Sequence, residues 1–418
     1  MHVDSINVQL LKINVGDGVT VDGYAIKGEM MKSATRMDDR PIDVPRGLTN
    51  VIVTETELSD VRGQEGFYHY RQYSATELAR TRSVEDIWQL LLDGALPTAK
   101  ERAQFAAQIT AASTLSAELS QALPMIARST RSADGLAGLR VALSLEGASA
   151  GLRPLYDLSI EHRREDLINL ASKTPTIIAA LHRLSEGKEP VPPRPELGYV
   201  ANYLYMLMGT VPPPQAVAGL SAYLGAAVDH GFNASTFTAR VIASTGADAA
   251  SCLVGALGAL SGPLHGGAPS RALDTLDAIG NPENIDAWIS ERLTAGQRIM
   301  GFGHPVYRTE DPRSALLKEV AKSFGGPRVD FAVTVEERVP VLLEKFKPGR
   351  QLHTNLEWYA AIVMELCGIS RDLFTPTFAA ARILGWTANV LEQSNDPKII
   401  RPSARYVGPP PPQPIPSI

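Results

Sequence analysis

Cysteine is scarce in this chain. Its 418 residues include two cysteines, Cys252 and Cys367, and both lie among apolar neighbours. Two cysteines are too few for the disulfide framework of a small secreted protein, and a thiol in apolar surroundings behaves as a small hydrophobic side chain. We therefore expect both thiols to be buried and free in a reducing compartment, rather than a bridge or a reactive nucleophile.

A signal peptide, a membrane-spanning run and a strong net charge are also lacking. The first residues contain neither a basic nor an apolar segment, and the apolar stretches stop short of the roughly 20 residues that span a bilayer. The formal net charge of −5 gives no general attraction to nucleic acid or anionic lipid. We expect a cytoplasmic protein with neither a membrane nor a nucleic acid as partner.

The sequence shows no spacing typical of metal ligands. His230, His265, His304 and His353 are scattered along the chain, without a clustered cysteine or carboxylate partner. We expect no metal site and no permanently bound cofactor.

What the sequence does contain is helical periodicity. With 44% hydrophobic and 20% charged residues, its composition is that of a globular protein with a sizeable core. From about Ala75 onward, apolar residues recur at spacings of three and four, which predicts helices. We expect residues 1–46 to form short strands or loops and the proline-rich tail after Gly408 to be extended and exposed. Two stripes are each expected to form one helix face: Phe105, Ile109, Ala112, Leu115, Leu119 and Leu123, and then Ile177, Leu181 and Leu184.

Two histidines lie in glycine-rich motifs that predict a binding site. His265 lies in the segment 262–268, Gly-Pro-Leu-His-Gly-Gly-Ala, and His304 in the segment 300–308, which ends at Arg308 and is followed by Asp-Pro-Arg313. Glycine lets the backbone approach a ligand closely, and arginine suits carboxylate or phosphate. Each motif alone has an ordinary alternative, since a lone histidine often holds a tight turn and a lone Gly-x-Gly is usually a turn.

Arg382 lies in an apolar run, Phe378 to Trp386. An unpaired charge buried among apolar side chains is costly, so this arginine is expected to have an anionic partner.

Together these segments resemble the citrate synthase family. The resemblance also includes Ser59–Gly63, Tyr70–Tyr73, Asp229–Thr236 and Arg401–Gly408, in colinear order over most of the chain. Ala268–Arg271 is similar to the bacterial branch often called citrate synthase 2.

The resemblance implies an almost wholly α-helical fold of two domains. A large domain would comprise residues 47–265 and 363–407, and a small domain on the CoA side would comprise 266–362. Residues 1–46 would be an N-terminal extension and 408–418 a proline-rich tail. Members of the family are homodimers or assemblies of dimers, with both subunits contributing to each site.

The reaction implied is condensation of acetyl-CoA with oxaloacetate and water to give citrate and CoA. A carboxylate is poorly matched to a thioester methyl group, so the enolate oxygen must receive hydrogen bonds away from water. By resemblance, His265 donates to the thioester oxygen, His304 donates to the oxaloacetate ketone, and Glu357 is the base.

The resemblance also assigns the binding residues. Oxaloacetate would be held by His230, Arg313, Arg382 and, from the other subunit of a homodimer, Arg401. CoA would be held by Gly301 and Gly303 around the adenine and by Arg308 at a phosphate. A surface ion pair of Arg308 with Glu310 or Asp311 is the alternative, and it would contribute little stability.

Glu357 departs from the pattern, because much of the family has aspartate there. The added methylene displaces the carboxylate unless the backbone compensates. We expect an adapted site in which Glu357 lies in the first turn of a helix, where the helix dipole favours its ionised form. The alternatives are a structural residue at a helix start and a weakly active or regulatory paralogue that binds CoA or oxaloacetate. A 2-methylcitrate synthase using propionyl-CoA also remains open, since one methyl group changes binding by only about 1–3 kcal/mol.

Overall fold

The computed structural model describes residues 8–15, 19–26, 41–130, 135–266, 269–304, 306–346, 348–349 and 352–416. For residues 8–26 and 269–270 it describes the backbone alone. Contacts divide the chain into two compact units, one of residues 1–53 with 402–418 and one of residues 54–401. The expected division of the helical body at 266 and 362 stays a prediction.

The first unit contains a β-hairpin and extended chain. Strand β1 (Val8–Val15) pairs antiparallel with β2 (Val19–Ile26), and a short 3₁₀ helix, η1, spans Arg46–Leu48. Arg405 forms an exposed ion pair with Asp43 at 2.8 Å. The described tail after Gly408 is exposed and has no helix or strand, so both expectations for the chain ends are confirmed where the structure describes them.

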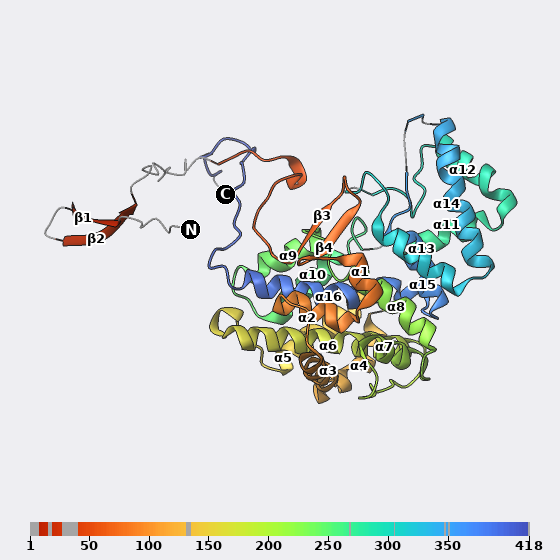
Figure 1. Cartoon of the computed structure of the whole chain (residues 1–418), viewed down its shortest axis with the longest axis horizontal. Helices are drawn as coiled ribbons and strands as arrows, with labels where there is room; N and C mark the ends of the chain where they lie inside the picture. The colour runs from red at the N-terminus through yellow and green to blue at the C-terminus, as the bar shows by residue number, and fades with distance from the viewer. Residues whose placement is uncertain are drawn as a thin grey trace, which may run out of the picture. The chain divides into compact units, whose positions relative to one another are not determined.

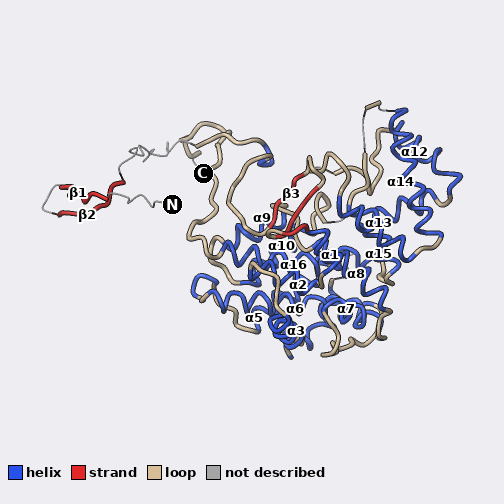
Figure 2. The backbone as a smooth tube through the Cα atoms, viewed as in Figure 1, coloured by secondary structure: helices blue, strands red, loops and turns tan. Residues whose placement is uncertain are grey.

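The second unit is helical, which confirms the all-α fold class (Figures 1 and 2). Its small antiparallel sheet has the strand order β3 (Ser59–Arg62), β4 (Phe67–Tyr70), β5 (Tyr73–Ser74). The helices of its first half are α1 (Ala75–Thr81), α2 (Val84–Asp93), α3 (Ala99–Ala112), α4 (Ala117–Ser129), α5 (Leu136–Ser149), α6 (Ile160–Ser185), α7 (Tyr199–Met208), α8 (Pro214–Ala227), α9 (Ala234–Ala243) and α10 (Ala249–Leu260). Those of its second half are α11 (Pro269–Ile279), α12 (Ile285–Thr294), α13 (Pro312–Phe324), α14 (Pro327–Phe346), α15 (Leu356–Leu366) and α16 (Phe374–Gln393). Three short 3₁₀ helices join them: η2 (Leu155–Asp157), η3 (Pro282–Asn284) and η4 (Arg371–Leu373).

Helix α16 forms the centre of the core. It packs against α2, α6, α8, α9 and α10, and Figure 1 shows it running through the middle of these helices. A helix that is apolar nearly all round is stable only when it is buried on all sides. A Cβ atom on Gly385 would lie 2.1 Å from the Val228 carbonyl oxygen, so glycine is required where α16 meets the end of α8. This contact brings Arg382 next to the segment that carries His230.

A buried arginine fixes α9 to α16. Arg240 donates to the side chains of Gln393 and Asn389, each at 3.0 Å, and pairs with Glu392 at 2.6 Å. Three partners satisfy the charge that burial would otherwise make costly. These contacts fix the last turn of α9 to α16, and the first turn of the same helix carries Ser235, which contacts His265.

One predicted helix is two. Phe105, Ile109 and Ala112 belong to α3, whereas Leu119 and Leu123 belong to α4, although all five are buried as expected. The break occurs because the Ser116 hydroxyl caps α4 by accepting from the Leu119 N–H at 3.1 Å. Spacing of apolar residues predicts burial, but it does not exclude a turn between two helices that share a face.

Helices α11 to α15 gather on one side of this unit in Figure 1. Helix α15 packs against α11 and α13, and α12 packs against α14. The first turn of α15 and the start of α13 meet here, and both carry predicted site residues.

Both cysteines are buried and free, as predicted, and burial raises the pKa of each thiol to about 12. In the described part of the chain, no helix is long and apolar enough to cross a membrane.

Candidate active site

His265 lies in a turn that follows α10. Its N–H donates to the Gly262 carbonyl at 2.9 Å, and a Cβ atom on Gly266 would lie 2.3 Å from the Leu260 carbonyl oxygen. The glycine after His265 is therefore required by the turn itself, and not only to leave room for a ligand. Gly267, the second glycine of this motif, lies outside the described residues.

The first turn of α9 orients the His265 ring. Asn233 caps this helix by accepting from the Thr236 N–H at 3.1 Å, and the Ser235 N–H and hydroxyl lie 3.3 and 2.8 Å from His265 Nε2. A backbone N–H can only donate, so Nε2 accepts and the ring proton is on Nδ1. His265 thus presents an Nδ1–H donor.

His304 is oriented by its own loop. Its Nδ1 accepts from the N–H groups of Val306 and Tyr307 at 3.0 and 3.1 Å. The ring proton is therefore on Nε2, which points toward Nη2 of Arg313 at 3.2 Å. Two donors lie side by side there, so a ketone or carboxylate oxygen next to the pair could accept a hydrogen bond from both.

A short backbone ladder connects the His304 loop to the start of α15. Phe302 pairs antiparallel with Thr354, and the Asn355 N–H donates to the Gly301 carbonyl at 2.9 Å. Gly301 and Gly303 have φ of 87° and 85°, which side chains rarely adopt. The segment predicted to bind CoA therefore also fixes His304 relative to the helix that carries Glu357.

His230 joins the same group. Its Nε2 is 2.9 Å from the Tyr307 hydroxyl, and its ring centroid is 5.7 Å from that of His304. His230 immediately follows Asp229, whose carboxylate accepts hydrogen bonds from the Ser59 hydroxyl and the Asn389 amide.

Arg313 is already paired inside the protein. It is buried and forms a bidentate ion pair with Asp311, with Nε–Oδ1 and Nη2–Oδ2 distances of 2.9 and 2.8 Å. Its charge is therefore largely compensated before a ligand arrives, which the sequence reasoning did not foresee.

Arg382 has no ion pair in the described part of the chain, although the buried Asp229 carboxylate acts on its charge. It is 2% exposed; its Nε donates to the Ala227 carbonyl at 2.9 Å, and its guanidinium lies over the Phe378 ring. Among the described residues Arg382 forms no ion pair, and burial lowers its pKa. A buried guanidinium with one hydrogen bond is an anion-binding group without an anion.

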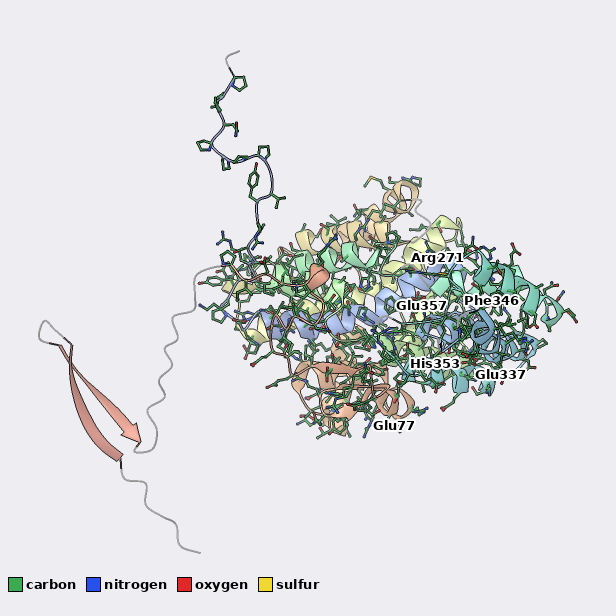
Figure 3. All side chains as sticks on the ribbon, turned by 90° about the horizontal axis from the view of Figure 1, so that it is seen from above. Glu77, Arg271, Glu337, Phe346, His353 and Glu357 are labelled. Carbon is green, nitrogen blue, oxygen red and sulfur yellow. The ribbon has the colours of Figure 1, made fainter. Side chains whose placement is uncertain are left out.

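Glu357 lies in the first turn of α15, where its N–H donates to the Asn355 side chain at 3.1 Å. Burial raises its pKa to about 7, although Arg313 and Arg271 act in the opposite direction. Figure 3 labels Glu357 and Arg271. The helix dipole was expected to favour the ionised form of this carboxylate, and burial acts in the opposite direction, because desolvation disfavours the charged form. A carboxylate with a raised pKa is a stronger base.

The surroundings of His230, His265 and His304 favour neutral imidazoles at pH 7. Burial and nearby arginines hold the pKa of His230 well below its usual range and lower those of His265 and His304 to about 4. They are therefore expected to act as uncharged N–H donors.

The structure thus brings most predicted residues together and leaves two apart. His230, His265, His304, Arg313, Arg382 and Glu357 are connected by the contacts and charge interactions above. Arg308 is exposed, and within the described chain its side chain pairs with neither Glu310 nor Asp311. Arg401 is exposed too, and its side chain forms no hydrogen bond or ion pair with these six described residues.

Sequence reasoning missed the residues that position this group. Asn233 and Asp311 directly precede helices and belong to the residue types that cap them, so capping preferences could have singled them out. Tyr223, on α8, had no such signal; its buried hydroxyl has no hydrogen-bond partner among the described residues and lies near Arg382 and Glu357.

A cavity of about 150 Å³ between α3, α6 and α7 contains none of the predicted site residues. The described residues contain no group of three potential metal ligands.

Comparison with known proteins supports one family. Residues 47–403 match the family model described as citrate synthase, C-terminal domain. The chain is 36% identical over 369 residues to the citrate synthase of Deinococcus radiodurans, covering 88% of this chain and 96% of that protein. It is also 36% identical over 367 residues to citrate synthase 2 of Bacillus subtilis, covering 87% and 96%.

Solved structures agree. The crystal structure of citrate synthase from Thermotoga maritima has a TM-score of 0.77 and 34% identity, covering 89% of this chain and 98% of that one. A ternary complex of Thermoplasma acidophilum citrate synthase with carboxymethyl coenzyme A and oxaloacetate has a TM-score of 0.81 and 26% identity, covering 90% and 98%.

Proposed function

The chain belongs to the citrate synthase family and condenses acetyl-CoA with oxaloacetate and water to give citrate and CoA, and we propose that His265, His304 and Glu357 perform the chemistry. The observation that best supports a dianionic substrate is Arg382, a buried guanidinium that forms no ion pair with any described residue. In this role one carboxylate of oxaloacetate forms an ion pair with the Arg382 guanidinium. His230 and Arg313 provide further hydrogen-bond donors.

The first step is enolisation. Glu357 takes a proton from the acetyl methyl group, and the Nδ1–H of His265 donates to the thioester oxygen as negative charge develops on it. A neutral imidazole is well suited to this role, because its pKa of about 4 excludes a competing imidazolium at neutral pH. The Glu357 pKa of about 7 reduces the mismatch with the carbon acid.

The second step forms the carbon–carbon bond. The nucleophilic carbon of the enolate attacks the ketone carbon of oxaloacetate, and the Nε2–H of His304 donates to the ketone oxygen, which becomes the alkoxide and then the hydroxyl of the product. Water then hydrolyses the citryl thioester, which releases citrate and CoA with its free thiol. We assign Gly301, Gly303 and the exposed Arg308 to CoA binding, where Arg308 would meet a phosphate.

Thiol release tests this function directly. Purified protein with oxaloacetate is expected to release thiol from acetyl-CoA, and propionyl-CoA in place of acetyl-CoA tests the 2-methylcitrate alternative. No thiol release from either thioester would contradict the function. A larger kcat/KM with propionyl-CoA would make the alternative the better description of the enzyme.

Arg382→Leu is expected to raise the oxaloacetate KM about tenfold to a hundredfold, because the variant loses a charge-assisted hydrogen bond to a substrate carboxylate in the ground state. The KM for acetyl-CoA should change little. Steady-state kinetics with each substrate varied in turn measures both constants.

Arg128→Leu is the matched control, because it removes the same charge from an exposed position on α4. An unchanged oxaloacetate KM in folded Arg382→Leu would show that Arg382 serves packing instead.

We further propose a cytoplasmic homodimer in which Arg401 acts in the partner's site. Its exposure and lack of contact with the group in its own chain support this assignment. Neither Arg401→Leu nor His265→Ala protein should be active alone. After mixing and exchange of subunits, about a quarter of the sites should be intact, since half of the dimers are mixed and each has one complete site.

Mixed dimers, shown to form by differential tagging, should therefore regain thiol release. Mixed dimers without activity would place Arg401 in its own subunit's site or in none.

A further inference from the structure

Asp311 uses both of its carboxylate oxygens to join two parts of the site. Its Oδ1 accepts from the N–H and Nε of Arg313 at 3.0 and 2.9 Å. Its Oδ2 accepts from Nη2 of Arg313 at 2.8 Å and from the N–H of Leu356 at 3.0 Å. The side chain is 1% exposed, so these four donors replace all of its hydration.

The two parts are far apart in sequence. Arg313 lies at the start of α13, whereas Leu356 is the first residue of α15 and directly precedes Glu357. Arg313 in turn points Nη2 at His304 at 3.2 Å. One buried carboxylate therefore fixes the orientation of the substrate arginine, the turn that carries the base, and the spacing between them.

Capping of α13 does not by itself require aspartate. Asp311 caps that helix by accepting from the Arg313 N–H, and serine or asparagine would cap it about as well. What serine and asparagine lack is the negative charge. Burying a charge is costly unless a partner such as Arg313 balances it. Aspartate therefore differs from serine and asparagine here in the effect of its charge on the neighbouring groups.

We propose that Asp311 is a positioning residue that locks Arg313 and the first turn of α15 into one unit and holds its negative charge against Glu357. The proposal rests on the assignment of Glu357 as the base. In this role Asp311 acts through Arg313 and the first turn of α15, because both of its oxygens already accept hydrogen bonds from them.

The charged and titratable groups that face Glu357 come from three packed elements. From the start of α13 come Arg313, which lowers the Glu357 pKa, and Asp311, which raises it; from α11 comes Arg271, which lowers it. From α8 comes Tyr223, which stays neutral because burial raises its pKa. Removing the charge of Asp311 should therefore lower the Glu357 pKa for two reasons. The repulsion between the two carboxylates is lost, and the positive charge of Arg313 is no longer balanced by Asp311.

The test compares Asp311→Asn, which keeps the shape but removes the charge, with Asp311→Glu, which keeps the charge but alters the spacing. One readout is the infrared titration of the ligand-free protein, in which the carboxyl band of Glu357 is the band lost in Glu357→Gln. The other is the pH dependence of kcat/KM for thiol release. Circular dichroism and thermal melting show whether each variant is folded.

We expect Asp311→Asn to move the Glu357 titration midpoint and the acid limb of kcat/KM to lower pH, by at least about half a unit, and to lower kcat about tenfold or more. The rate should fall even at high pH, because a less basic carboxylate is a poorer base. Asp311→Glu should lower kcat while the midpoint stays near that of wild type. If Asp311→Asn does not fold, Asp311→Ser keeps the α13 cap and should show the same downward shift.

Arg271→Gln provides a control of opposite sign, because loss of that exposed cation should move the midpoint upward. A folded Asp311→Asn or Asp311→Ser protein with an unmoved or raised midpoint would overturn the proposal, even if its rate is reduced. The infrared readout does not depend on turnover. If the wild-type protein releases no thiol but the Glu357 midpoint still moves to lower pH in Asp311→Asn, the proposed function is contradicted and the positioning role of Asp311 is supported.

Discussion

Glu357→Gln is expected to lower turnover by about 10² to 10⁴, the range that a positioned general base contributes, while binding of oxaloacetate changes little. Glutamine keeps the shape of glutamate but cannot accept the methyl proton. Exchange of the acetyl methyl protons with solvent deuterium, followed by NMR, measures the lost step itself. Calorimetric titration with oxaloacetate checks that the site still binds its substrate.

The pH dependence of the wild-type enzyme tests the same assignment. The base must be ionised, and burial raises the pKa of Glu357 to about 7, so the ionised fraction falls about tenfold for each unit below that pH. The value of kcat/KM should therefore rise from pH 5 to about pH 7 and then level off. His265 and His304 should add no further change to kcat/KM in this range, because burial lowers the pKa of each to about 4.

Glu357→Asp distinguishes an adapted site from a handicapped one. If the backbone fits the longer side chain, aspartate should withdraw the carboxylate from the methyl group and lower the rate. A strong gain in turnover would instead mean that the natural glutamate limits the enzyme. Unchanged proton exchange in Glu357→Gln would mean that another group is the base.

His304→Ala is expected to lower kcat by about 10² to 10³, the effect of removing one donor from an oxyanion site, with a smaller change in the oxaloacetate KM. The Nε2–H stabilises charge that develops on the ketone oxygen during attack, so most of its effect belongs to the transition state. His265→Ala should show a comparable loss, first in methyl proton exchange. Steady-state thiol release measures the first effect and deuterium exchange the second.

His353→Ala is the matched control. This exposed histidine belongs to the same backbone ladder, where its carbonyl accepts from the Gly303 N–H, and its side chain takes no part in that contact. Its turnover should stay within about twofold of wild type, as expected for an exposed side chain away from the chemistry. A folded His304→Ala enzyme with near-wild-type turnover would remove His304 from the mechanism.

The residues that sequence reasoning identified well are those with a strong local signature. Arg382 was expected to be buried because apolar residues surround it in the chain, and the structure places it on the central helix without an ion pair in the described region. The helices, the two buried cysteines and the two His-Gly motifs likewise depend on neighbours within a few residues. Such features are predictable because backbone conformation and burial follow local patterns.

The features that sequence reasoning missed depend on contacts between distant segments. The Asp311 carboxylate meets Leu356, and the Ser235 hydroxyl meets His265, although each pair is far apart in the chain. The apolar stripe from Phe105 to Leu123 also needed the structure, because the cap at Ser116 divides it into two helices.

The amino-acid sequence by itself determined the all-α fold class, the family and the identity of the chemical groups, because these follow from periodicity and from colinear motifs. Only the tertiary structure decided their charge states. Burial raises the pKa of Glu357 and lowers those of His230, His265 and His304. Asp311 pairs with Arg313, while Arg382 forms no ion pair within the described chain. Desolvation and pairing depend on which groups the fold brings together, and no local pattern contains that information.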